Sequence, residues 1–125
     1  MTQARASEVM GELAAKGLSV SGLGYYPNPL HADAGHREAV TGHLKKVITA
    51  ASLMQVGVVN TFLGGDRTLT VDQNWARALQ IFPAIVAHAR DCGVTLAFEY
   101  CPAATTSPMC RKSGDGFSRR GTRWG

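Results

Sequence analysis

The sequence predicts an α/β fold with parallel strands, and two observations support this. One unit recurs three times along the chain: a helix with an apolar face, a glycine, and a short apolar strand. The glycines that open the three strands stand at positions 17, 57 and 93. Strands that alternate with helices in this way run parallel, and right-handed crossovers join them. Ligands bind such folds where the strands end, so a site is expected there.

The sequence contains boundary signals for two helices. The first is predicted over residues 6–16, with Ser7 as a candidate cap. The second begins at Asp33, and its apolar residues recur at helical spacing up to Gly57. A glycine just past a helix end adopts the left-handed conformation without strain, so Gly17 and Gly57 are expected to end these helices.

The third helix is predicted to begin with a capping box. Thr70 and Gln73 have the required spacing, and an apolar face follows them. Pro83 lies inside this helix and is expected to kink it or split it in two. The strands are expected at residues 18–24, 58–63 and 94–99.

Composition indicates one globular domain. The chain has 125 residues, of which 45% are hydrophobic and 18% charged. Acidic and basic side chains balance over residues 1–102, so the net charge of +4 belongs to residues 103–125. A neutral body argues against nucleic-acid binding. Neither a membrane span nor a secretory signal is recognisable, so a cytoplasmic location is expected.

Residues 103–125 interrupt the pattern. They are rich in Gly, Ser, Thr and Arg and show neither helical nor strand periodicity, so we interpret them as a disordered basic tail. The chain has three cysteines in a spacing that fits neither a zinc site nor a redox motif. Reduced thiols are therefore expected.

Glu99 is the strongest candidate for chemistry. It stands at the C-terminal end of an apolar strand, where active-site carboxylates of α/β barrels lie. A carboxylate there can bind a metal or move a proton. The alternative interpretation, a solvated residue at a strand end, has equal weight from position alone.

Five further residues are candidates for substrate binding. Tyr26 can stack on a sugar face, and Arg67, in a glycine-rich loop, can pair with a phosphate. The other candidates are polar residues near strand ends: Asn28, Asn60 and Thr61. Each also has an ordinary structural explanation, as part of a stiff turn, a backbone partner or a common loop.

Several segments together resemble the sugar phosphate isomerase/epimerase family of xylose isomerase-like TIM barrels. The resemblance covers residues 6–102, and its most specific stretch is Gly22-Leu-Gly-Tyr-Tyr-Pro-Asn-Pro-Leu30. Other matching stretches are His36-Arg-Glu-Ala-Val40, His43-Leu-Lys-Lys-Val-Ile48, Val58-Val-Asn-Thr-Phe62 and Phe98-Glu-Tyr-Cys-Pro102. The family implies a (β/α)8 barrel that isomerises or epimerises small sugars or sugar phosphates by moving a proton next to a carbonyl. It also implies a divalent metal, namely Mn, Mg, Zn or Co.

By this resemblance Glu99 is a metal ligand and candidate base, and Asn60 and Thr61 face the same pocket. The family's usual Glu-Asn-Cys-Pro is here Glu-Tyr-Cys-Pro, with Tyr100 in place of asparagine. Its other metal ligands come from later strands, which residues 103–125 do not match. The resemblance therefore implies a partial barrel of about three strands that does not hold the metal alone and has little or no activity. The change of composition after residue 102 suggests an out-of-frame tail.

Two other functions stay open at this stage. The family is related to endonuclease IV-type DNA-repair barrels, although the neutral body disfavours a DNA-binding surface. A non-catalytic α/β interaction module is the other alternative. In that case the open edges of a three-stranded sheet would pair with another chain or with a second copy.

Overall fold

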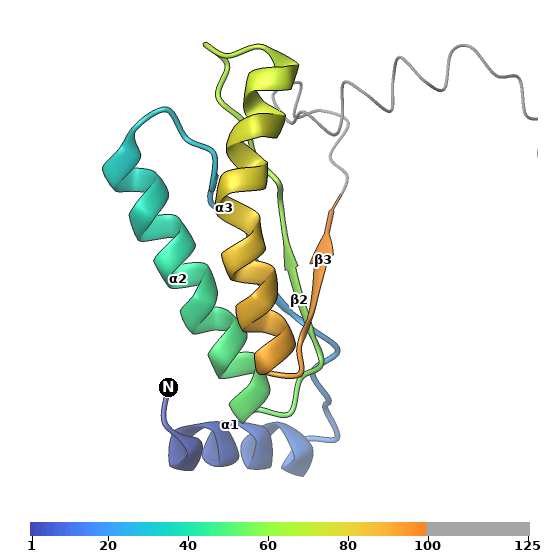
Figure 1. Ribbon diagram of the computed structural model, residues 1–125. Coiled ribbons are helices and arrows are strands. Elements are labelled where there is room, and N and C mark those ends of the chain that lie inside the picture. The colour runs from blue at the N-terminus through green and yellow to red at the C-terminus, as the bar shows by residue number, and fades with distance from the viewer. Residues whose placement is uncertain (100–125) are drawn as a thin grey trace, which may run out of the picture.

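The computed structural model describes residues 1–99, which form three helices and three strands in alternation (Figure 1). The predicted fold class, an α/β arrangement of parallel strands, is confirmed. The predicted tail, residues 103–125, lies outside the described residues. The elements in order are α1 (Gln3–Ala15), β1 (Leu23–Tyr25), α2 (Ala34–Leu53), β2 (Val58–Thr61), α3 (Val71–Asp91) and β3 (Thr95–Phe98).

The three strands form one open parallel sheet in the order β1-β2-β3. Tyr25 lies beside Thr61, and Thr61 lies beside Phe98, so the strands end at one level. Helices α2 and α3 run side by side over one face of this sheet (Figure 1). Helix α1 lies across the end of the molecule where the strands begin (Figure 1). There the Gln3 side-chain amide donates a hydrogen bond to the Leu53 carbonyl over 3.2 Å.

The hydrophobic core lies between the sheet and the two helices. Val59 and Thr61 in β2 are fully buried, whereas the alternate residues Val58 and Asn60 are half-buried. Side chains alternate between the faces of a strand, so Val59 and Thr61 face the helices and Val58 and Asn60 face away. The largest fully buried apolar residues of the core are Leu30, Leu44, Ile48, Val59 and Ile85.

Two helix boundaries differ from prediction. Helix α1 begins earlier than expected because Thr2, rather than Ser7, accepts the capping hydrogen bond from the Arg5 amide. Helix α2 ends at Leu53, and Gln55 takes the left-handed conformation with φ of 58°. The left-handed residue was predicted to be Gly57, which lies two residues further on.

Strand β1 and helix α3 also differ from expectation. The first strand was predicted from residue 18, but Leu18 is 56% exposed and pairing begins at Leu23. Helix α3 starts with the predicted capping box and continues through Pro83 without being split. Pro83 is exposed, so water can hydrate the carbonyl group that lacks a helical donor there. Among residues 1–99, no helix combines the length and hydropathy needed to span a bilayer.

Candidate functional site

Three side chains meet where the strands end. Tyr26, Phe62 and Glu99 each follow directly on a strand, and their preceding neighbours in the register face the helices. Alternation therefore directs the three toward the face of the sheet that the helices of residues 1–99 leave uncovered, called the uncovered face below. The rings of Tyr26 and Phe62 lie 4.8 Å apart, and the Tyr26 hydroxyl donates a hydrogen bond to Glu99 Oε1. Two of the predicted site residues are thus brought into contact.

The Tyr26–Glu99 contact fixes the protonation of the phenol. The hydrogen bond to Glu99 raises the pKa of Tyr26, and desolvation and the carboxylate charge act in the same direction. Tyr26 therefore stays a neutral donor at physiological pH. Tyr26 is 40% exposed and Glu99 is exposed, so both groups are open to a ligand arriving from solvent.

Gly24 explains how the Tyr26 ring reaches this position. A Cβ atom built at Gly24 would lie 2.9 Å from the Tyr26 ring, so the ring crosses the backbone of β1 at close range. A larger residue at position 24 would therefore require the Tyr26 ring to shift. Glycine at this position leaves room for the ring as it lies in the structure.

Asn28 joins the two loops that follow β1 and β2. Its side-chain nitrogen donates to the Gly65 carbonyl over 2.7 Å, and its oxygen accepts from the backbone amides of Gly65 and Leu30, each over 3.0 Å. Gly64 has φ of 77°, and a Cβ atom there would lie 2.1 Å from Asn28 Oδ1. The Asn28 side-chain amide therefore binds backbone groups of both loops, and the missing side chain of Gly64 leaves room for this amide.

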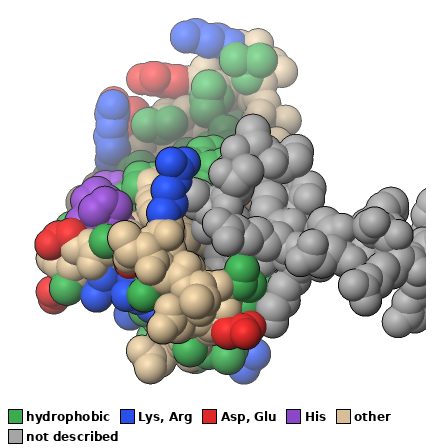
Figure 2. Space-filling model, turned by 90° about the horizontal axis from the view of Figure 1, so that it is seen from above, with side chains coloured by type: hydrophobic (Ala, Val, Ile, Leu, Met, Phe, Trp, Pro, Cys, Tyr) green, Lys and Arg blue, Asp and Glu red, His purple; other side chains and the backbone are tan. Residues whose placement is uncertain are grey.

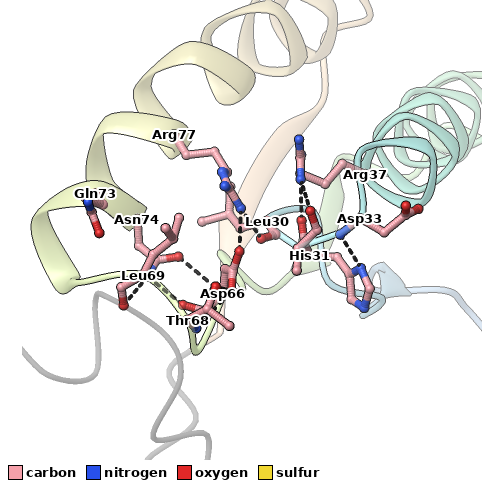
Figure 3. Close-up of polar contacts among 12 residues, drawn as sticks. Leu30, His31, Asp33, Arg37, Asp66, Thr68, Leu69, Gln73, Asn74 and Arg77 are labelled. Carbon is pink, nitrogen blue, oxygen red and sulfur yellow. Dashed lines mark hydrogen bonds and ion pairs between the residues drawn. The ribbon is translucent and has the colours of Figure 1, made fainter.

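A second, denser network fixes the loop after β2 (Figure 3). Asp66 is 6% exposed and accepts hydrogen bonds from the Thr68 hydroxyl and amide at one oxygen and from Arg77 at the other. Asn74, also buried, accepts from the Asp66 amide over 2.7 Å and donates to the Asp66 carbonyl over 2.9 Å. The loop is thus anchored to the first turns of α3.

The hydrogen bonds to Asp66 lower its pKa. The Thr68 hydroxyl has the largest effect, followed by the Thr68 amide, and the Arg77 guanidinium acts in the same direction, whereas burial opposes it. Arg77 also donates to the Leu30 carbonyl, so it connects this network to the loop after β1. The folded structure therefore favours the ionised form of Asp66.

Arg67 lies in the same loop but on the surface. With Asn28, His31 and Thr68 it lines a cleft of about 430 Å³ between the two loops. Figure 2 looks onto this end of the molecule and shows histidine side chains gathered on its left side, over α2. The rings of His31 and His36 lie 4.3 Å apart. Arg67 thus borders this cleft.

Asn60 and Thr61 lie on opposite faces of β2. Asn60 is directed to the uncovered face that also bears Tyr26 and Glu99, and its amide approaches Gly22 closely. Thr61 is fully buried on the helix side. The two residues therefore do not face one pocket, because adjacent residues in a strand point in opposite directions.

Sequence reasoning did not single out Phe62, Asn74 or Arg77. Phe62 was treated as part of a buried strand, although its position one residue beyond Thr61 places it on the uncovered face. Asn74 and Arg77 follow the capping box of α3 and are three residues apart in sequence. This spacing puts them near each other on one side of the first turns of the helix. That spacing was the available signal for the anchor of the loop.

The residues of the site do not make a metal centre by themselves. Within residues 1–99 there is no cluster of three or more His, Cys, Asp or Glu side chains placed to hold a metal ion. The other nearby strand-end carboxylate, Asp66, is already bound by Thr68 and Arg77. The metal that the resemblance implied therefore does not fit the described residues alone.

The parallel β/α units and the strand-end carboxylate define the chain as a portion of a β/α barrel. The model of the xylose isomerase-like TIM barrel family matches residues 1–118, so the chain belongs to that family. The match confirms the family predicted from the sequence. A search among curated proteins gives no significant match.

A solved structure supports the fold. The crystal structure of a proposed xylose isomerase from Rhodospirillum rubrum superposes with a TM-score of 0.66 and 20% sequence identity. The likeness covers 83% of this chain and 40% of that one, so the chain spans less than half the length of this neighbour. At this identity the comparison shows the fold, which is that of a partial TIM barrel.

Proposed function

We propose that this chain carries part of the active site of a sugar isomerase or epimerase, with a small sugar or sugar phosphate as substrate. The observation that supports this best is the Tyr26–Glu99 pair, a carboxylate and a neutral phenol in contact at the ends of parallel strands. Membership of the xylose isomerase-like family is the second support. Nothing in residues 1–99 favours the endonuclease alternative over this one.

The two side chains suit proton transfer next to a carbonyl group. In the proposed reaction, the Glu99 carboxylate takes a proton from the carbon beside the substrate carbonyl, and the electron pair moves onto the carbonyl oxygen. The Tyr26 hydroxyl has a single proton, which it donates to Glu99 in the free chain. In the proposed reaction it turns this hydrogen bond to the oxygen on which negative charge develops. An isomerisation is completed when the proton returns to the former carbonyl carbon and the hydroxyl proton of the adjacent carbon passes to the former carbonyl oxygen. An epimerisation is completed when a proton donor from outside residues 1–99 protonates the original carbon on its other face.

The surroundings of the pair suit a sugar. The rings of Tyr26 and Phe62 form an apolar surface for the C–H face of a sugar, and Asn60 on the same face of the sheet can bind its hydroxyls. Arg67, which lines the neighbouring cleft, binds the phosphate group of a phosphorylated substrate in this proposal. These roles are part of the proposal, in which Asn28 contributes by holding the two loops in position.

The chain alone is expected to have weak activity or none. Residues 1–99 contribute three strands, whereas a full barrel builds its active site at the C-terminal ends of eight. A divalent metal at Glu99 would need further ligands from outside residues 1–99. Robust turnover by the purified 125-residue chain would contradict this expectation.

Proton exchange is the most sensitive test of the proposal. The full chain is incubated in D₂O with a panel of ketoses and their phosphates, with and without Mn²⁺ or Mg²⁺, and NMR follows loss of the C–H signal beside the carbonyl. We expect slow exchange that Glu99→Gln abolishes and Tyr26→Phe reduces about tenfold. Glu12→Gln, an exposed change in α1, is the matched control. Exchange above the protein-free background that is equal in wild type and Glu99→Gln would refute the role of Glu99, and its absence in wild type would refute the expected exchange.

A further inference from the structure

The cleft of about 430 Å³ is lined by Arg67 from the loop after β2 and by His31 from the loop after β1. Small-molecule sites typically have volumes of about 300–1,000 Å³. Within residues 1–99, no hydrogen bond or ion pair engages the Arg67 guanidinium, whereas Arg77 is paired with Asp66. The donors of Arg67 are therefore not used by the loops that form the cleft.

The tautomer of His31 is set by the backbone of its own loop. The Asp33 amide donates a hydrogen bond to His31 Nδ1 over 3.0 Å, so this nitrogen is the acceptor (Figure 3). A neutral imidazole that accepts at one ring nitrogen has its proton on the other, so His31 Nε2 is a donor. The Asp33 carboxylate accepts from the His36 amide over 2.6 Å and does not line the cleft.

The other polar side chains that line the cleft already have partners. The Asn28 amide binds backbone groups of both loops. The Asp66 carboxylate accepts from Thr68 and is paired with Arg77. In the described lining, Arg67 is therefore the charge that no carboxylate neutralises. A spare cation beside a spare neutral donor favours an anionic ligand.

The loop that carries His31 is held in place by two arginines. Arg37 donates to the carbonyls of His31 and Ala32 over 2.7 Å each, and Arg77 donates to the Leu30 carbonyl over 3.2 Å (Figure 3). The network described above holds the other loop. A ligand that enters the cleft thus meets donors on ordered backbone, which lowers the entropic cost of binding.

We propose that His31 and Arg67 form the phosphate-binding part of the candidate site, which selects a phosphorylated sugar over a free one. Arg67 pairs with the phosphate through its guanidinium, and His31 donates from Nε2 to a phosphate oxygen. The two loops begin at Tyr26 and Phe62, so the cleft adjoins the rings that bind the sugar in the proposed function. The inference rests on that function for the sugar, whereas the phosphate contact is independent of Glu99.

Titration of the full chain with inorganic phosphate at constant ionic strength tests the phosphate contact, with NMR of the backbone amides of the two loops as the readout. We expect saturable shifts. His31→Asn keeps an acceptor for the Asp33 amide but lacks the Nε2 donor, so it should weaken phosphate binding about tenfold. His31→Gln retains a donor near the position of Nε2 and should weaken binding by about threefold or less.

Arg67→Gln should also weaken phosphate binding about tenfold, because it removes the charged partner. Arg5→Gln is the matched control, since it removes the same charge from an exposed arginine of α1 and should leave the affinity unchanged. Circular dichroism verifies the fold of each variant. The absence of saturable shifts, or equal affinity in wild type, His31→Asn and Arg67→Gln, would overturn the proposal.

Comparison of free and phosphorylated ketoses separates this inference from the proposed function. In the D₂O exchange experiment, wild type should exchange a ketose phosphate about tenfold faster than the same free ketose, and Arg67→Gln should reduce this ratio toward one. Phosphate binding without proton exchange on any ketose would support the phosphate site and contradict the proposed chemistry. Exchange at equal rates with both ketoses would overturn the selection of a phosphorylated sugar.

Discussion

Two carboxylates follow neighbouring strands, and their surroundings differ in almost every respect. Asp66, after β2, is 6% exposed and has three hydrogen bonds to its oxygens. Glu99, after β3, is exposed and receives one from Tyr26. Position at a strand end thus does not by itself identify a functional carboxylate. Saturation with protein donors indicates a structural role, and exposure with spare acceptor capacity leaves a group available to a ligand.

The largest loss of stability is expected for Gly64→Ala, a substitution in the loop that contains Asp66. The left-handed backbone and the 2.1 Å approach to Asn28 Oδ1 both penalise a Cβ atom. We expect a loss of about 3 kcal/mol, or roughly 12 °C in Tm. Gly17→Ala is the control, because Gly17 has a similar φ of 70° with nothing near its Cβ. Equal losses in the two variants would show that the Asn28 contact contributes nothing.

Replacing each acid by its amide compares the two carboxylates directly. Asp66→Asn should lower Tm by about 10 °C, because Arg77 loses its charged partner and two Thr68 donors face a poorer acceptor. Glu99→Gln should change Tm by less than about 2 °C, because exposed charges contribute little. Thermal melts followed by circular dichroism provide the measurement. A large loss in Glu99→Gln would erase the distinction between the two residues.

Acid should weaken the loop that contains Asp66, because protonation removes the charge to which Thr68 and Arg77 donate. The pKa of Asp66 is lower in the folded than in the unfolded chain, so its ionised form stabilises the fold above the unfolded pKa of about 4. This stabilisation is lost as the pH falls from about 4 through the folded pKa. The Tm difference between wild type and Asp66→Asn should therefore shrink by several degrees between pH 6 and pH 3. A constant difference across that range would contradict the lowered pKa.

The smallest expected effect is a change in the pKa of Tyr26, the phenol that contacts Glu99. Tyr26 should ionise above pH 10 because Glu99 holds its proton. In Glu99→Gln the pKa of Tyr26 should return toward its usual value. The tyrosinate absorbance at high pH, measured as a difference between wild type and Tyr26→Phe in each background, follows this group alone. An unchanged titration in Glu99→Gln would show that the hydrogen bond is absent in solution.

The sequence was sufficient for most of the fold. Helical spacing, caps and the repeated glycine–strand joints are local signals, and they placed the three helices and three strands of residues 1–99 in the correct order. The errors were at boundaries set by tertiary contacts. Strand β1 is short because Leu18 has no strand beside it, and Gln55 rather than Gly57 makes the turn out of α2.

The candidate site was only partly predictable. The parallel-strand rule found Glu99 and Tyr26 because it needs only strand ends. It could not separate Asn60 from Thr61, since an error of one residue in register reverses the face. It also gave no indication that Asn28 would be occupied by backbone groups or that Asn74 and Arg77 would anchor Asp66. These contacts join residues distant in sequence, and their geometry emerges only from the folded chain.

The bridge made by Asn28 has a consequence for redesign. One amide side chain ties the loop after β1 to the loop after β2, and Gly64 and Gly65 are shaped around it. The two loops are therefore structurally coupled. Replacing only one of them with a loop from another protein would leave the Asn28 amide without its partners or cause a steric clash with it. Changing ligand preference at this end of the barrel thus requires replacing both loops together.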